Sequence, residues 1–268
     1  MVRVGLVGCG TIGSQLALVI QRRYSSVARI SVLHDIDRTH AVALQRRLTS
    51  HPQIVSLTTL LRRSDLVLEA ASGDVAAVLV PQALRQHRSL LVMSVGGLLR
   101  NTEWQRLARR STGKVYIPSG ALAGLDGVKA MAIGRITKLS LTTSKPPRAL
   151  AEAPYVQRRR LRLDRLRRPS VIFEGSPRAV VRAFPQNTNV AAALALASGQ
   201  WGAHARIRVI ADPSLHRNQH EVEVEGDCGR IRCMVQSVPS HNPKTSELAV
   251  RSAVATLERI FGVVAIGT

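Results

Sequence analysis

The chain has 268 residues, enough for one large domain or two modest ones with a substantial buried core. Hydrophobic residues make up 45% of it, which excludes an intrinsically disordered protein. No apolar run approaches the roughly 18 residues of a membrane-spanning helix, and no secretory signal is recognisable. The sequence therefore predicts a soluble, cytoplasmic protein without a membrane partner.

The charge is strongly basic. Lys and Arg total 38 against 17 Asp and Glu, a formal net charge of +21. Such a balance raises nucleic acid, an acidic membrane surface or an anionic substrate as partners. Aromatic residues are only 3% of the chain, so stacking platforms for single-stranded nucleic acid are scarce. The composition favours a solvated basic surface over nucleic-acid binding.

Strand and helix alternate through the first half of the chain. The short apolar run Val2–Val7 is typical of a buried parallel strand, and residues 12–23 have helical periodicity. Further strands are expected at 30–33, 66–70 and 90–95, with helices at 39–49 and 75–87. This alternation predicts the α/β class, with the doubly wound parallel sheet of a Rossmann domain.

The pattern changes near residue 115, where a predicted strand at 115–117 leads into a glycine-rich turn. Beyond it we expect strands at 138–143, 171–173, 207–210, 221–224 and 230–235, and helices at 177–184, 188–196 and 245–261. We therefore predict a Rossmann domain over residues 1–117 and an α+β catalytic and dimerisation domain over 118–240. The C-terminal segment 241–268 is expected to pack back on the first domain.

One segment departs from both patterns. Residues 157–169 contain seven arginines, namely Arg158, Arg159, Arg160, Arg162, Arg165, Arg167 and Arg168. Crowding of like charges disfavours a stable isolated helix, so we expect a solvated loop or a frayed helix. The alternative is an electrostatic patch for RNA, DNA or an acidic partner.

A G-x-G-x-x-G motif follows the first predicted strand directly and opens the first predicted helix, the arrangement of a dinucleotide-binding loop. The residues expected to contact the cofactor there are Gly8, Gly10, Thr11, Ile12 and Gly13. The pyrophosphate of the cofactor would lie at the helix N-terminus, where unpaired N–H groups attract anions.

An acidic residue, Asp35, stands at the end of the second predicted strand. Its carboxylate can accept hydrogen bonds from the adenosine ribose, and its charge would repel the 2′-phosphate of NADP. The first expectation is therefore NAD. Arg38 lies near enough in sequence to leave NADP open as an alternative.

Four segments of the second half carry more polar and glycine residues than a core needs: 118–126, 184–191, 211–221 and 239–246. In these segments and in the opening glycine loop, the chain resembles the L-aspartate dehydrogenase family along nearly its whole length. The resemblance implies NAD(P)-dependent oxidation of L-aspartate to iminoaspartate, which feeds NAD biosynthesis, by a homodimer. It also implies that His220 is catalytic and that Ala123 and Asn189 contact the nicotinamide side of the cofactor.

The chemistry of His220 can also be argued from the residue type. Hydride leaves the Cα of an amine only when the nitrogen gives up a proton, which a neutral imidazole accepts near neutral pH. Asn218 could orient the imidazole ring. The alternative interpretation of His220 is a polar surface histidine that precedes a strand and has no catalytic role. The further candidate contacts to substrate carboxylates are Ser119, Gly120, Lys244 and Thr245. Lys244 could equally be a surface lysine.

Two other functions share features with this sequence. An acylating semialdehyde dehydrogenase shares the two-domain layout but needs a thiolate near the start of the second domain, and no cysteine lies between Cys9 and Cys228. A non-catalytic dinucleotide-binding protein would use the arginine-rich segment as a nucleic-acid patch. The cysteines, which include Cys233, have no spacing typical of a disulfide framework or a metal cluster, so no metal is expected.

Overall fold

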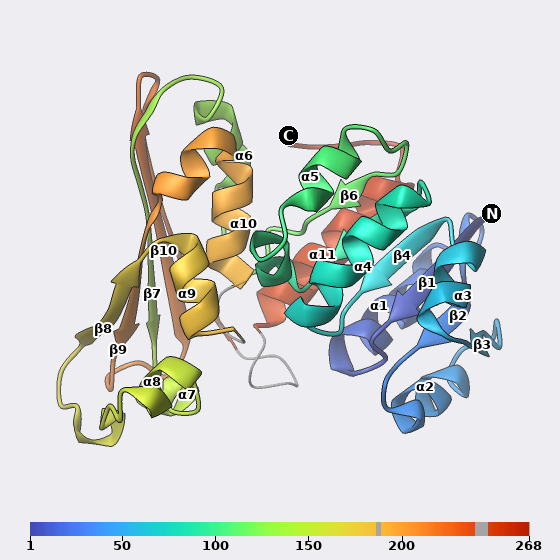
Figure 1. Ribbon diagram of the computed structural model, residues 1–268, viewed down its shortest axis with the longest axis horizontal. Helices are drawn as coiled ribbons and strands as arrows, with labels where there is room; N and C mark the ends of the chain where they lie inside the picture. Colours follow the sequence, from blue (N-terminus) through green and yellow to red (C-terminus); the bar gives the residue numbers. More distant parts are fainter. Residues whose placement is uncertain (186–188, 239–245, 268) are drawn as a thin grey trace. The chain divides into compact units, whose positions relative to one another are not determined.

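The computed structural model describes residues 1–185, 189–238 and 246–267. The chain forms two compact units: the first comprises Met1–Pro118 and Val250–Ala265, and the second comprises the described residues of Ser119–Ala249 with those of Ile266–Thr268. Figure 1 gives the helices and strands of each unit. Among the described residues, no helix combines the length and the apolar character needed to cross a membrane.

The first unit is a parallel six-stranded sheet of order β3-β2-β1-β4-β5-β6, which confirms the predicted Rossmann fold. Its strands are β1 Val2–Val7, β2 Ala28–His34, β3 Gln53–Ile54, β4 Leu66–Glu69, β5 Ser89–Val92 and β6 Val115–Tyr116. Its helices are α1 Thr11–Arg23, α2 Arg38–Gln45, α3 Leu57–Arg63, α4 Gly73–Arg85, α5 Glu103–Ala108 and the 3-10 helix η1 Val95–Leu99.

Helices cover both faces of this sheet. Val4 and Leu6 of β1 share a buried cluster with α1, and α3 reaches the opposite face at Gly5. The last helix, α11 Glu247–Phe261, adds Ala253 and Leu257 to the same cluster. The core of the first unit is therefore built from both ends of the chain.

The second unit is a mixed five-stranded sheet of order β11-β10-β7-β9-β8, as the α+β prediction required. Its strands are β7 Ile136–Lys145, β8 Ser170–Gly175, β9 Arg206–Ala211, β10 Asn218–Gly226 and β11 Gly229–Ser237. Its helices are α6 Leu125–Met131, α7 Pro147–Leu150, α8 Pro154–Arg158, α9 Pro177–Ala183 and α10 Asn189–Ala197, with 3-10 turns η2 Leu163–Arg165 and η3 Gly199–His204.

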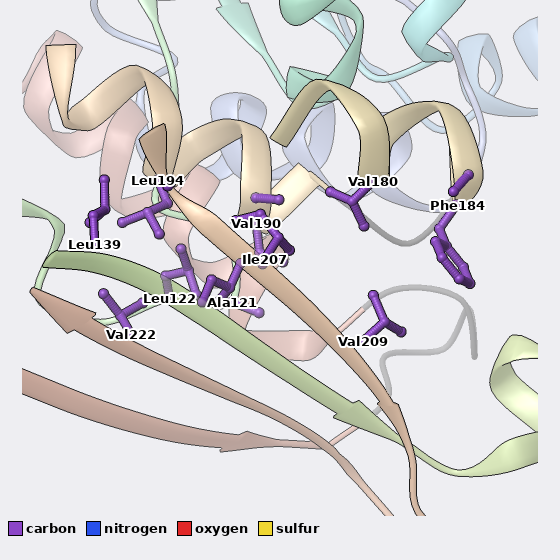
Figure 2. Packing of buried hydrophobic residues seen from close by; sticks show 14 of the residues in the cluster. Ala121, Leu122, Leu139, Val180, Phe184, Val190, Leu194, Ile207, Val209 and Val222 are labelled. Carbon is purple, nitrogen blue, oxygen red and sulfur yellow. The ribbon is translucent and has the colours of Figure 1, made fainter. Parts of the chain in front are cut away.

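One face of this second sheet carries the core. Figure 2 shows Val180 and Phe184, from α9 and its end, and Val190 of α10 beside Ile207 and Val209 of β9. These side chains pack because alternate residues of a strand face the same side and α9 and α10 turn their apolar faces toward it.

The arginine-rich segment is not a simple loop. It begins in α8 and includes η2, and the buried Val156 and Leu163 anchor it to the core of the second unit. All seven of its arginines are exposed, and Arg162 forms an ion pair with Asp164 at 3.2 Å. Two apolar anchors therefore order a stretch whose charges alone would disfavour structure.

The strand expected at 90–95 is shorter than predicted. Strand β5 ends at Val92, and Val95 opens the 3-10 helix η1 instead. The 3-10 helix packs closely on α4, because a Cβ on Gly97 of η1 would overlap the backbone of Gly73 at the start of α4.

Candidate cofactor and proton-transfer sites

The glycine loop follows β1 and leads into α1. Gly8 has φ of 91°, in the left-handed region that favours glycine, and a Cβ there would overlap the backbone of Ala70 after β4. A Cβ on Gly13 would overlap the carbonyl oxygen of Gly8. The tight turn between β1 and α1 therefore depends on these two glycines.

Gly10 behaves differently from its two neighbours. No described atom lies within 4 Å of the place where its Cβ would be, so this side of the loop is open. Gly10 also occupies the N-cap position of α1, which begins at Thr11 and continues with Ile12. A pyrophosphate can approach the backbone N–H groups of the helix start here, which is the fit that a dinucleotide requires.

Asp35 is held against the same loop. One of its carboxylate oxygens accepts the backbone N–H of Cys9 at 2.6 Å, and the other accepts that of Asp37 at 2.9 Å. Asp37 in turn caps α2 by accepting the N–H of Thr39. The structure thus brings together the glycine loop and Asp35 within the first unit, while Arg38 stands exposed at the start of α2.

A buried carboxyl group that the sequence analysis missed lies at the end of β4. Glu69 is fully buried, and its two oxygens accept the backbone N–H groups of Ala71 and Ser94, each at 2.9 Å. Burial raises the pKa of Glu69, and these hydrogen bonds oppose that rise. Since Ala70 packs on Gly8, Glu69 braces the loops that border the glycine loop. An acidic residue closing an apolar strand was the available signal.

His220 lies inside β10, third in the strand, and only 3% of it is exposed. The surface-histidine alternative is therefore wrong. Its Nδ1 is 3.2 Å from Oγ1 of Thr143 on the neighbouring strand β7. When Nδ1 is protonated and donates a hydrogen bond to the hydroxyl oxygen of Thr143, the Nε2 atom keeps its lone pair and can accept a proton. Sequence reasoning did not identify Thr143.

Lys145 is the second residue near His220 that the sequence did not reveal. It ends β7 and is 4% exposed. Burial lowers the pKa of Lys145 to about 8. Burial, and then the charge of Lys145, lower the pKa of His220 to about 3. The imidazole in the free protein is therefore neutral across the physiological range.

Five other predicted site residues lie in the described part of the second unit outside the contact between His220 and Thr143, and two more are not described. Asn218 begins β10, half-buried, but the contact to the imidazole comes from Thr143. Ser119 and Gly120 lie in the turn before α6, where Gly120 has φ of 66°. Ala123 is exposed just before α6, and Asn189 is the exposed first residue of α10. Lys244 and Thr245 lie outside the described residues.

Across residues 1–185, 189–238 and 246–267, no three His, Cys, Asp or Glu side chains gather as a metal site would require. Cys9 sits in the glycine loop, where burial, followed by the charge of Asp35, raises the pKa of its thiol to about 12. A thiol with that pKa stays protonated and is a poor nucleophile. The candidate chemistry therefore rests on the glycine loop and the His220 cluster.

Two family models match the chain. The model described as "Aspartate dehydrogenase, C-terminal" matches residues 126–260, and the one described as "Homoserine dehydrogenase, NAD binding domain" matches residues 8–118. The L-aspartate dehydrogenases of Methanosarcina barkeri and Methanosarcina acetivorans are 40% and 42% identical to it over 274 residues, with full coverage of both chains. The crystal structure of aspartate dehydrogenase from Thermotoga maritima matches with a TM-score of 0.73 and 21% identity, covering both chains completely, and supports the fold.

Proposed function

This chain belongs to the L-aspartate dehydrogenase family, and from that premise we propose that it oxidises L-aspartate to iminoaspartate with NAD. Hydrolysis of the imine then gives oxaloacetate and ammonia, and the imine itself can feed NAD biosynthesis. The observation that carries the proposal is the buried imidazole of His220, which contacts Thr143 through Nδ1 and is kept neutral by its lowered pKa. The loss of hydride from an amine requires an acceptor for the ammonium proton, and the neutral imidazole offers its Nε2 lone pair for that role.

The first unit would hold the cofactor. Gly10 and the start of α1 would take the pyrophosphate, and Asp35 the adenosine ribose. Ala123 and Asn189 are proposed to contact its nicotinamide side. The bound cofactor supplies the hydride acceptor. We propose NAD over NADP because the carboxylate of Asp35 would repel a 2′-phosphate, although the exposed Arg38 could offset part of that repulsion.

The second unit would move the proton. Nε2 of His220 accepts a proton from the substrate ammonium, which frees the nitrogen lone pair. That lone pair forms the C=N bond as hydride leaves Cα, so two electrons and one proton depart with the hydride and one further proton is left on the imidazole. In the reverse direction the imidazolium returns the proton to nitrogen. Thr143 keeps the ring in place through Nδ1 in both directions.

An assay of purified protein with L-aspartate and either NAD or NADP tests the proposal by the appearance of reduced cofactor. We expect oxidation of L-aspartate with a higher kcat/KM for NAD, and a loss of about 10²–10⁴-fold in kcat for His220→Ala. The matched control is His204→Asn, which changes an exposed histidine of the same unit. No aspartate oxidation with either cofactor, or equal rates for His220→Ala and wild type, would refute the proposal.

We propose further that the protein acts in the cytoplasm as a homodimer, and that Ser119, Gly120, Asn218, Lys244 and Thr245 contribute substrate contacts. Light scattering coupled to size-exclusion chromatography measures the mass directly. A mass equal to the 29.1 kDa of one chain at working concentration would refute the dimer.

A further inference from the structure

His220 and Lys145 occupy the same end of the same sheet face. Thr143 pairs with His220 across β7 and β10, and Lys145 stands two residues further along β7, so the two β7 side chains point to one side. That side is the core face, since Thr143, Lys145 and His220 are 4%, 4% and 3% exposed. The cationic side chain of Lys145 and the imidazole of His220 are therefore buried on one face of the sheet.

A small cavity adjoins the lysine. Its volume is about 10 Å³, and its polar lining residues are Thr143 and Lys145. The remaining lining is apolar and includes Phe184, Val190 and Ile207. A space of this size admits one water molecule, or one oxygen atom of a carboxylate whose other atoms lie outside the cavity.

The acidic residues of β10, the strand that carries His220, face away from the imidazole. Glu221 and Glu223 alternate with His220 along β10, so they face the other side of the sheet. There they pair with Arg232 and with Lys138, respectively. The neighbouring β11 residue opposite His220 is the apolar Val235, and α9 and α10 line the cavity with apolar side chains. Within the described part of the chain, Lys145 is the charge that shifts the imidazole.

The positive charge of Lys145 weakens His220 as a base for the substrate ammonium. With the pKa of His220 lowered to about 3, the free imidazole is neutral but too weak a base to take a proton readily from an ammonium group. A negative charge placed beside Lys145 would offset the ammonium and strengthen the base. The two buried groups are therefore coupled through whatever anion approaches the lysine.

We propose that Lys145 binds a carboxylate of the substrate and thereby makes His220 competent to accept a proton only when an anionic amino acid is present. The proposal rests on the proposed function, because it assigns Lys145 to the same proton-transfer site. Its ligand class is a small dicarboxylate whose negative charge exceeds that of its single ammonium. A neutral amino acid brings no net charge to offset the lysine, so the coupling also favours acidic substrates.

The test measures the pKa of the His220 imidazole directly. Protein labelled with ¹⁵N-histidine and saturated with NAD is titrated by NMR with and without succinate, a dicarboxylate that has no amine to oxidise. In wild type we expect succinate to raise the pKa of His220 by one unit or more, as a neighbouring anion does. In Lys145→Met we expect a higher pKa for His220 without succinate and no rise on adding it. Lys145→Arg keeps the charge and should retain the response.

The kinetic counterpart compares two pH profiles. The pH profile of kcat/KM reports the pKa of the base in the free protein, and the pH profile of kcat reports the pKa of the same base in the substrate complex. In wild type the pKa of the base is expected to be higher in the kcat profile, and in Lys145→Met the two values should converge. Lys145→Gln serves as a second neutral variant should Lys145→Met give no folded protein by circular dichroism.

An unchanged His220 titration in both neutral variants, with the same response to succinate as wild type, would overturn the role of Lys145. That outcome is distinct from failure of the proposed function, which would appear as an absence of aspartate oxidation in wild type itself. The NMR readout does not depend on turnover, so either result stands without the other.

Discussion

Glu69→Gln tests whether the buried carboxyl group braces the cofactor-binding loops. In the wild-type structure each oxygen of Glu69 accepts one backbone N–H, from Ala71 and from Ser94. Glutamine has a single acceptor oxygen, so its NH₂ group must face one of the two N–H donors. One buried N–H then loses its acceptor, which costs about 1–3 kcal/mol of the free energy of unfolding.

The two units offer separate probes for this measurement. Trp104 lies in the first unit, where its Nε1 donates to the carbonyl of Leu98, and Trp201 lies in the second, where its Nε1 donates to that of Gly134. These are the two tryptophans of the chain, so Trp104→Phe and Trp201→Phe each leave one reporter. Glu69→Gln should lower the urea midpoint reported by Trp104 and leave the Trp201 transition in place.

The effect of pH gives an independent check with a defined sign. Burial raises the pKa of Glu69 in the folded protein, so the folded state holds this proton more tightly than the unfolded state. The resulting stabilisation is present below the unfolded pKa and is lost as pH rises through the folded pKa. Glutamine does not titrate, so the difference in free energy of unfolding between wild type and Glu69→Gln should shrink as pH rises.

Asp74→Asn is the matched control, because Asp74 is an exposed acid of the same unit that pairs with Arg100. Surface pairs contribute about 0–1 kcal/mol, so its transition should barely move. An unchanged Trp104 midpoint in Glu69→Gln, or a deficit equal to that of Asp74→Asn at every pH, would refute the bracing role.

Three further outcomes follow from single contacts. Thr143→Val removes the partner of His220 Nδ1, and we expect kcat to fall about tenfold while Thr143→Ser retains it, with reduced cofactor as the readout. Asp35→Ser removes the carboxylate at the ribose position, and the ratio of kcat/KM for NADP to that for NAD should rise about tenfold, whereas an unchanged ratio would contradict the assignment of Asp35. Leu257→Ala leaves a cavity at a fully buried position of α11 and should lower the free energy of unfolding reported by Trp104 by about 2–5 kcal/mol. An unfolding midpoint equal to that of wild type would show that this packing is unimportant.

The first unit was predictable because its signals are local. An apolar strand, a glycine motif and a periodic helix follow one another within the first 23 residues, and each is decided by neighbours in sequence. The missed helices and strand are short: β3 has two residues, α5 has six and α3 has seven, capped by Ser56. Short segments give too few positions for a periodicity to emerge.

The candidate site was predicted less completely because its contacts are long-range. Thr143 and His220 are 77 residues apart, and only the register of β7 against β10 brings them together. The same register decides that Lys145 faces the core, so the chain order Ser-Lys-Pro-Pro conveys neither its burial nor its neighbour. Glu69 was missed for a related reason, since its partners are backbone N–H groups of loops whose positions no residue type reveals.

The net charge of +21 and the buried charge of Lys145 are expected to affect different steps of the reaction with an anionic substrate. Exposed arginines, such as those around Arg162, are screened over about 8–10 Å at physiological salt, so they can change the rate of encounter but not the protonation of a buried base. Lys145 is screened far less because it is buried on the face that carries His220. Added salt should therefore weaken substrate capture, through KM, while the pH dependence of kcat stays where Lys145 sets it. A pH profile of kcat that shifts with salt as KM does would assign the control of the base to the surface charge instead.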